Sequence, residues 1–420
     1  MDVIAAGIVR DTYVAPAIAD PQQAARDALA RVLSGRIARG ARVAITAGSR
    51  GIANGPTLLR GLAAAVRDAG GEPFFVPAMG SHGGGTADGQ LAMLMSLGIT
   101  PETVGAPIVS AMDVVDVGVT PAGVPVYCDA RAARADAIVI ANRIKPHTHF
   151  AGTIESGMLK MSAIGLGKAV GAATYHAAFT SHGYEQTIRE VAAVMFARLP
   201  VVAGVGFVDD HRGSTHAVEA FAADEIVAGE ERLLVEARAF LSVLPFDELD
   251  LLVVDEMGKE LSGAGMDTNV TARSMDGRTQ KVARPLIRQL FVRDLTMESH
   301  GNANGVGIAD FCSRRLADKI DWQATYLNAM TSAAPAGARL PVVCANDREA
   351  VNYALTAAGV ERLADARVAR IKNTLHIDAM VVSAAALATL RNAERYVVAG
   401  DSDALTFGPG DDFAGFPPVA

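Results

Sequence analysis

The chain has 420 residues, half of them hydrophobic, and a formal net charge of −8. This length predicts two domains, each with enough apolar residues to form its own core. The acidic balance argues against a nucleic-acid-binding protein, which usually presents a basic face, so we expect no nucleic-acid partner. A few local arginines and lysines can still attract a small anion into one cleft.

The first half of the chain alternates between helix and strand patterns. Asp20 followed by Pro21 predicts the start of a helix, and residues 42–48 (RVAITAG) are typical of a buried strand. A helix at 56–71 and a strand at 72–78 then complete a βαβ unit, which implies parallel strands. The series continues with strands at 113–119, 135–142 and 200–210, and helices at 86–98, 185–199 and 230–244.

A second α/β series begins near residue 245. Strands are predicted at 244–258, 340–346 and 377–384, and helices start near Asp347 and Ala384. We therefore predict an α/β fold of two domains with largely parallel sheets, residues 1–245 and 246–420, and an active site in the cleft between them. An exchange of segments across this boundary stays open.

Neither the N-terminal sequence nor the cysteine content indicates export. The N-terminal sequence MDVIAAGIVRD lacks a basic segment followed by a long apolar one, and the longest apolar run, LPVVAGVGFV, is too short to span a bilayer. Cys128, Cys312 and Cys344 are widely separated and form no CxxC motif, which excludes an ordinary cysteine-ligated zinc or iron–sulfur site. We expect a cytoplasmic protein with no membrane partner.

Reactive side chains gather in loops that follow predicted strands, where open parallel sheets bind their ligands. GSRGIANG holds Ser49 and Arg50, and a guanidinium is a planar fork suited to a carboxylate or phosphate, although most such arginines are simply solvated. GSHGGGT holds His82 in a run of glycines before a helix, a context typical of anion cradles. With no bulky neighbours to bury it, His82 is either idle on the surface or faces a ligand.

The third loop lies in IKPHTHFAGTIESGMLK. Its His147 and His149 form a His-x-His pair, a common fragment of metal sites, but two ligands do not make a site. Lys160 has apolar neighbours, where a lysine either extends to the surface or has a lowered pKa and acts as a nucleophile. His176 follows, as a core histidine or a ligand.

The motifs GSRGIANGP, PAMGSHGGGT and KPHTHFAGTIESGMLK, followed by a histidine 16 positions after Lys160 (176 − 160), resemble the nickel-pincer nucleotide-dependent lactate racemase family. The resemblance implies a racemase or epimerase that acts on a small anionic 2-hydroxy acid by reversible hydride transfer at C2. It also implies loading by cofactor-biosynthesis enzymes, and it leaves room for a homo-oligomer. The family pattern is stretched between His147 and Lys160. His147 and His149 therefore compete for one role, and we favour His147 because it directly follows Pro146.

The resemblance assigns roles residue by residue. His82 and His147 resemble the two acid–base histidines, and His176 resembles the nickel ligand. The residues that it implies for holding the cofactor, with Lys160 as the covalent attachment point, are Lys160, Ser49, Arg50, Ser156 and Gly157.

Polar, glycine-rich stretches in the second half supply further substrate candidates. The candidates from the second half are Lys259, Asn269, Arg273 and His300, and those from the first half are Arg50 and His149. So many polar groups would suit a substrate larger than lactate, such as a sugar acid, or they form only a network of structured turns. Two alternatives to the racemase are a zinc hydrolase with His82, His147, His149 and His176 as ligands, and a non-catalytic binding protein with two lobes.

Overall fold

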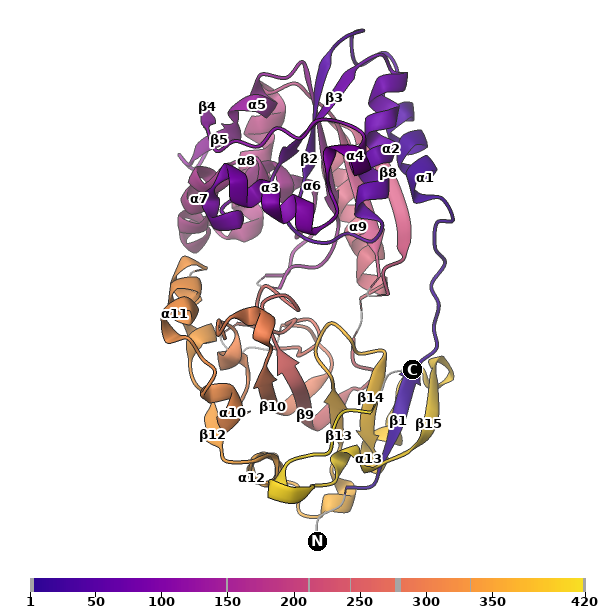
Figure 1. Ribbon diagram of the computed structural model, residues 1–420, viewed down its shortest axis with the longest axis vertical. Coiled ribbons are helices and arrows are strands. Elements are labelled where there is room, and N and C mark those ends of the chain that lie inside the picture. Colours follow the sequence, from indigo (N-terminus) through magenta and orange to yellow (C-terminus); the bar gives the residue numbers. More distant parts are fainter. Residues whose placement is uncertain are drawn as a thin grey trace. The chain divides into compact units, whose positions relative to one another are not determined.

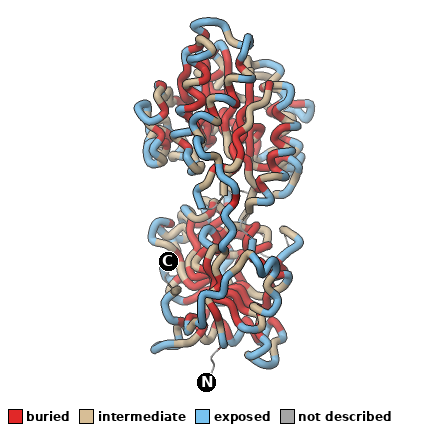
Figure 2. The backbone as a smooth tube through the Cα atoms, turned by 90° about the vertical axis from the view of Figure 1, so that its right-hand side faces the viewer, coloured by how far each residue is buried: buried red, intermediate tan, exposed pale blue. Residues whose placement is uncertain are grey.

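The computed structural model describes residues 4–148, 150–210, 212–241, 243–275, 281–332 and 334–417. The chain forms two compact units (Figure 1). Residues 15–241 are here called the inner unit and residues 1–14 with 242–420 the outer unit, names that refer only to their order in the sequence. Buried residues concentrate along the strands of each unit (Figure 2). These bounds differ from the expected 1–245 and 246–420 because the first strand pairs within the sheet of the outer unit.

The inner unit contains a five-stranded sheet in the order β3-β2-β6-β7-β8. Its strands are β2 (Arg42–Ala47), β3 (Glu72–Pro77), β6 (Ala137–Arg143), β7 (Val201–Asp209) and β8 (Thr215–Ala222). The first four are mutually parallel, and only β8 runs antiparallel to its neighbour. Their nearly continuous apolar sequences reflect burial on both faces, as expected for a parallel sheet covered by helices.

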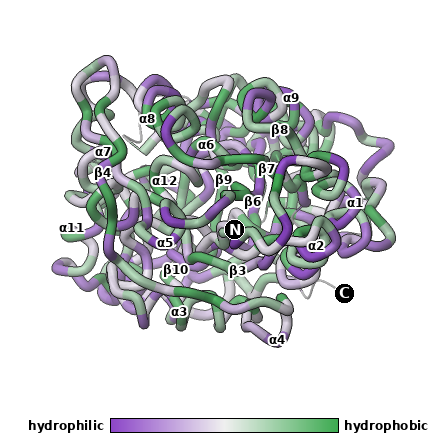
Figure 3. Tube along the Cα trace, turned by 90° about the horizontal axis from the view of Figure 1, so that it is seen from above, coloured by the Kyte–Doolittle hydropathy of each residue, from purple (hydrophilic) through white to green (hydrophobic). Residues whose placement is uncertain are grey.

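Helices cover both faces of this sheet. One core contains Val43 and Ile45 of β2 with residues of α1 (Pro21–Leu33), α2 (Gly55–Asp68) and α3 (Ala87–Ser96). The opposite core contains Ala44 with residues of α7 (Lys168–His182), α8 (Tyr184–Arg198) and α9 (Ile226–Ala239). The side chain of Asp20 accepts a hydrogen bond from the N–H of Gln23, as predicted for the cap of α1. Hydrophilic and hydrophobic residues alternate along α1 and α2 (Figure 3).

The segment 113–119 differs from its predicted place in the parallel series. It contains β4 (Val114–Val119), which pairs antiparallel with β5 (Pro125–Asp129) in a separate two-stranded sheet. β4 is only partly buried, because it packs beside α8 rather than between two layers of helices. The four-residue helices α4 (Pro101–Val104) and α5 (Ala130–Ala133) flank this region.

The outer unit contains an eight-stranded sheet in the order β12-β11-β10-β9-β13-β14-β1-β15. Its strands are β1 (Ala6–Asp11), β9 (Glu248–Met257), β10 (Leu286–Leu295), β11 (Phe311–Ser313), β12 (Val342–Cys344), β13 (Val368–Ile371), β14 (Ala379–Ser383) and β15 (Tyr396–Ser402). The strands from β12 to β13 are parallel, and β14, β1 and β15 follow antiparallel. The helices of this unit are α10 (Arg314–Ala317), α11 (Trp322–Thr331), α12 (Asp347–Ala357) and α13 (Ala384–Leu387). Two of them start where the sequence predicted, at Asp347 and Ala384.

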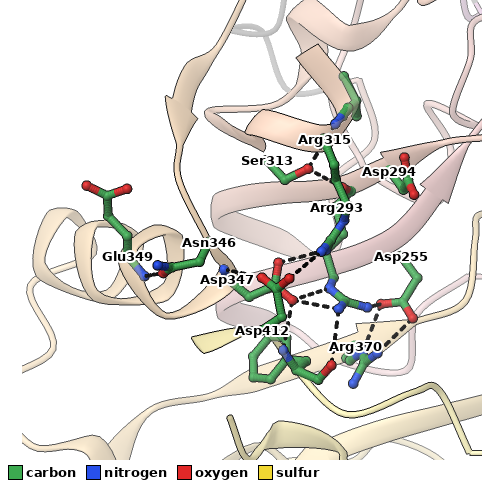
Figure 4. Close-up of polar contacts among 12 residues, drawn as sticks. Asp255, Arg293, Asp294, Ser313, Arg315, Asn346, Asp347, Glu349, Arg370 and Asp412 are labelled. Carbon is green, nitrogen blue, oxygen red and sulfur yellow. Dashed lines mark hydrogen bonds and ion pairs between the residues drawn. The ribbon is translucent and has the colours of Figure 1, made fainter. Parts of the chain in front are cut away.

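A buried charge network joins the sheet of the outer unit to the C-terminal segment (Figure 4). Arg370 is fully buried and donates two hydrogen bonds of 2.8 Å to the carboxylate of Asp255. Arg293 bridges Asp255, at 2.9 Å, and Asp347, at 2.6 Å. The N–H of Phe413 donates to Asp347, and its ring centroid lies 5.1 Å from the Arg370 guanidinium. The network therefore fixes the C-terminal segment against the strands.

Candidate functional site

The predicted loops of the inner unit lie at one edge of its sheet. β2, β3 and β6 are parallel neighbours or next neighbours, so their carboxyl ends lie together. Ser49 and Arg50 follow β2, His82 follows β3, and His147 follows β6. The structure thus brings the first three predicted loops to a common edge.

His82 is held in place by Ser49. The Ser49 hydroxyl oxygen lies 2.5 Å from Nδ1 of His82, a contact between loops that follow adjacent strands. His82 is exposed, and Gly83 after it has φ of +66°. A Cβ on Gly83 would lie 2.5 Å from the backbone of Gly89, so glycine lets the His82 loop pack directly on the first turn of α3. The contact with Ser49 therefore orients the His82 ring.

Cationic side chains cluster at the same edge. The pKa of Lys160 is lowered to about 7, first by the loss of water around its amine and then by the charges of Lys145 and Arg50. Loss of water and the charge of Arg143 likewise lower the pKa of Arg50. Arg143 is partly balanced by Asp209, 3.3 Å away at the end of β7. Repulsion among these cations favours a neutral Lys160 amine. Their combined positive charge also attracts an anionic ligand.

A tight turn presents Lys160. It ends the short helix α6 (Met158–Lys160), which continues into a π-helical turn at Met161–Gly165. Met158, Leu159 and Met161 are buried, whereas Lys160 itself is half-buried. The apolar neighbours therefore anchor the turn on both sides of Lys160.

Glu230 of α9 contacts the backbone of this turn. It is fully buried and accepts a hydrogen bond of 2.9 Å from the N–H of Leu159. A Cβ on Gly157 would lie 2.3 Å from the Glu230 carboxylate, so a larger residue there would have to displace that carboxylate. Asn142 also donates to the Gly157 carbonyl oxygen, at 2.8 Å. The turn is consequently fixed to β6 on one side and to α9 on the other.

The loop between β6 and α6 is closed at its base and filled by a carboxylate. Lys145 and Ser156 exchange two backbone hydrogen bonds of 2.9 and 3.1 Å, which places Ser156 beside the start of the loop. Glu155 is buried inside the loop, where it accepts from the backbone N–H groups of His147 and Gly152 and pairs with Arg238 at 2.7 Å. These contacts fix the backbone of His147 relative to Gly152. His149 lies outside the described residues.

A row of rings connects His147 to His176. The His147 ring lies 4.6 Å from Phe150, which stacks on Tyr184 at 4.9 Å. Tyr184 in turn stacks on Phe179 at 4.2 Å, and Phe179 lies 5.3 Å from the His176 ring on α7. Both histidines are half-buried. They therefore border one aromatic surface, which the sequence patterns did not reveal.

Of the four candidates in the outer unit, Asn269 and Arg273 lie in the long segment that leads from β9 to β10, and both are engaged within that unit. The contacts of Arg273 place it at the amino ends of β10 and β11 rather than at the carboxyl ends of the strands. Arg273 pairs with Asp310 at 2.6 Å and donates to the carbonyl oxygens of Ile287 and Ile308. Asn269 is buried and accepts a hydrogen bond of 2.7 Å from Lys281. These contacts favour the turn-network interpretation for Arg273 and Asn269.

Lys259 and His300 lie on adjacent loops, after β9 and β10. The backbone N–H of Lys259 donates to the Ser299 hydroxyl at 2.9 Å, and its amine donates to the Gly263 carbonyl oxygen. His300 is exposed with φ of +47°. Of the four, His300 is the one that presents its side chain most openly at this edge.

The described residues contain no group of three or more His, Cys, Asp or Glu side chains placed to hold a metal. The zinc alternative also includes His149, which lies outside the described residues, so it stays a hypothesis. The three cysteines are buried, and burial raises the pKa of Cys312 to about 12 and that of Cys344 to about 11. Within the described part of the chain, no helix has both the length and the apolar character to cross a membrane.

The comparisons with known proteins support the fold alone, through similarity to a solved structure. No protein-family model and no curated protein matches the sequence. Among solved structures, the chain is similar to the lactate racemase apoprotein from Thermoanaerobacterium thermosaccharolyticum, with a TM-score of 0.53 and 13% identity over 88% of this chain and 98% of that chain. The inner and outer units thus form the kind of two-domain α/β fold that the sequence predicted, and this fold occurs in a lactate racemase.

Proposed function

We propose that the protein is a racemase or epimerase of a 2-hydroxy acid that works with a nickel-pincer nucleotide. The observation that carries this proposal is Lys160: an amine of pKa about 7 beside Arg50 and Lys145, at the same sheet edge as the oriented His82. The fold shared with a lactate racemase apoprotein supports it, as does the motif resemblance.

The residues of the site fit such a cofactor. A neutral amine is the form of lysine that forms a covalent bond to an acyl-type carbon, and the pKa of Lys160 provides it near pH 7. Arg50 and Lys145 supply the positive charge that a nucleotide phosphate needs, with Ser156 and Gly157 at the base of the Lys160 turn. A pincer nucleotide would bring its own soft donors, so the protein would need to add one imidazole, for which we assign His176. When bound, this cofactor would accept a hydride from C2 of the substrate and return it.

The side chains of the protein manage the substrate's proton and its carboxylate. To take the hydroxyl proton, His82 must be unprotonated at Nε2, so its Nδ1–H donates to the Ser49 oxygen. His147 acts on the hydroxyl in the opposite enantiomer, because the oxygen then lies on the other side of C2. An arginine, with Arg50 as our candidate, holds the carboxylate so that only the geometry at C2 changes.

Peptide mass spectrometry tests the assignment. The chain is produced with and without enzymes that build the pincer nucleotide, and we expect a nucleotide adduct on Lys160 with one bound nickel only when those enzymes are present. Lys160→Arg, which keeps a long basic side chain but has no amine that can be neutral near pH 7, is expected to lose the adduct, and His176→Ala to lose nickel. An unmodified Lys160 and bound zinc under loading conditions would refute the proposal.

A further inference from the structure

Lys168 is buried in an unusual conformation at the start of α7. Its side chain is fully buried, and its backbone has φ of +55°, a region that residues with a Cβ seldom adopt. Such strain persists where the surrounding contacts hold the residue firmly, and it is common near functional sites. The lysine is thus not a second attachment point for a cofactor, because its amine is enclosed.

The Lys168 amine connects three separate segments of the inner unit. It pairs with Asp129, also fully buried, at 3.1 Å, at the end of β5. It donates to the carbonyl oxygen of Pro77 at the end of β3, and to Oε1 of Gln90 on α3 at 3.1 Å. The ammonium therefore has an acceptor from each segment, as a buried charge requires.

Gln90 carries this connection to the His82 loop. Its side chain is fully buried, and its Nε2 donates to the carbonyl oxygens of Gly80 at 2.9 Å and His82 at 3.4 Å. The orientation of the amide is unambiguous, because the ammonium of Lys168 requires the oxygen on one side and two carbonyls require the NH₂ on the other. The backbone on both sides of Ser81 is thereby held by one amide.

We infer that Lys168 and Gln90 are positioning residues that hold the His82 loop so that the imidazole meets Ser49 and the substrate. The chain of contacts runs from Asp129 through Lys168 and Gln90 to the backbone of His82. This inference rests on the proposed function for its effect on turnover, but its effect on the His82 loop can be measured without any activity.

Two substitutions of Gln90 separate positioning from a merely structural role. Gln90→Glu keeps an oxygen for Lys168 but replaces the donor to the loop carbonyls by an acceptor, whereas Gln90→Met removes both bonds. Gln22→Glu makes the same chemical change at an exposed position on α1 and is the matched control. If Gln90 only satisfies the buried charge, Gln90→Glu behaves like the unmodified chain and only Gln90→Met is affected.

Hydrogen exchange and steady-state kinetics on the loaded full chain test whether Gln90 holds the His82 loop. For both Gln90 variants we expect at least tenfold faster exchange in peptides covering 78–86, at least a tenfold loss of kcat, KM within about threefold, and unchanged loading of Lys160. Wild-type exchange and kcat in Gln90→Glu would overturn the inference. If the loaded unmodified chain racemises nothing, the proposed function fails, and the exchange data alone then decide whether Gln90 holds the loop.

Discussion

Replacement of Glu230 by glutamine is expected to change how stability depends on pH. Loss of water around this fully buried carboxyl raises its pKa to about 7, although the N–H groups of Leu159 and Met158 act in the opposite direction. A glutamate in an unfolded chain has a pKa of about 4.3. Between these two values the folded state keeps a proton that the unfolded state releases, so this group lowers stability as the pH rises through that window.

The size of the effect follows from the two pKa values. A difference of roughly 2.7 units at about 1.4 kcal/mol per unit gives on the order of 3–4 kcal/mol between pH 4 and pH 8. Glutamine keeps an oxygen to accept from the Leu159 N–H but does not ionise. The free energy of unfolding of Glu230→Gln, relative to the unmodified chain, should therefore rise by about that amount over this range.

Urea unfolding at several pH values measures this difference. Hydrogen exchange in peptides of β6 and β7 follows the inner unit, while fluorescence of Trp322, the single tryptophan, follows the outer unit as an internal reference. Glu231→Gln, next to Glu230 but half-buried, controls for the loss of one carboxylate from α9. Parallel pH profiles for Glu230→Gln and the unmodified chain would refute the reasoning.

Three further outcomes follow from the contacts of both units. With a pKa of about 7, roughly half of the Lys160 amines are neutral at pH 7, against about one in 2,500 for an ordinary lysine. The rate of acetylation of Lys160, followed by mass spectrometry, should therefore rise with pH with a midpoint near pH 7, and a midpoint above pH 9 would contradict this. Ser49→Ala removes the hydrogen bond to His82 and should lower kcat, referred to the fraction of chain that carries the cofactor, about tenfold in steady-state assays; an unchanged kcat would contradict the orienting role. Arg370→Met removes the bidentate hydrogen bonds to Asp255 and should lower the free energy of unfolding of the outer unit by about 3 kcal/mol or more. Urea unfolding followed by tryptophan fluorescence measures this loss, and a loss below about 1 kcal/mol would contradict the prediction.

Local patterns predicted the parallel strands of the inner unit well, because buried βαβ units carry both continuous apolar runs and clear helix caps. They could not place residues 113–119, since an isolated hairpin and a sheet strand share the same alternation of side chains. The pairing of β1 with β14 joins segments nearly the whole chain apart, and no local signal specifies such a partner.

The site shows the same division between local and long-range information. Ser49, His82 and Lys160 could be singled out because each follows a predicted strand in a glycine-rich or apolar context. The roles of Glu230 and Gln90 could not be predicted, because a buried carboxyl or amide on a helix looks like an ordinary surface residue in sequence. Arg273 was singled out as a substrate ligand, yet its guanidinium donates to carbonyl oxygens of its own unit, a contact set only by the tertiary fold.

The most direct test of the proposed chemistry uses a 2-hydroxy acid carrying deuterium at C2. A panel of single enantiomers, from lactate to sugar acids, is incubated with the loaded chain in ordinary water, and the products are analysed by chiral chromatography and NMR. Hydride transfer predicts that the inverted product keeps its deuterium at C2, because the transferred hydride does not exchange with water. Replacement of that deuterium by solvent hydrogen, or no inversion of any acid in the panel, would contradict the proposal.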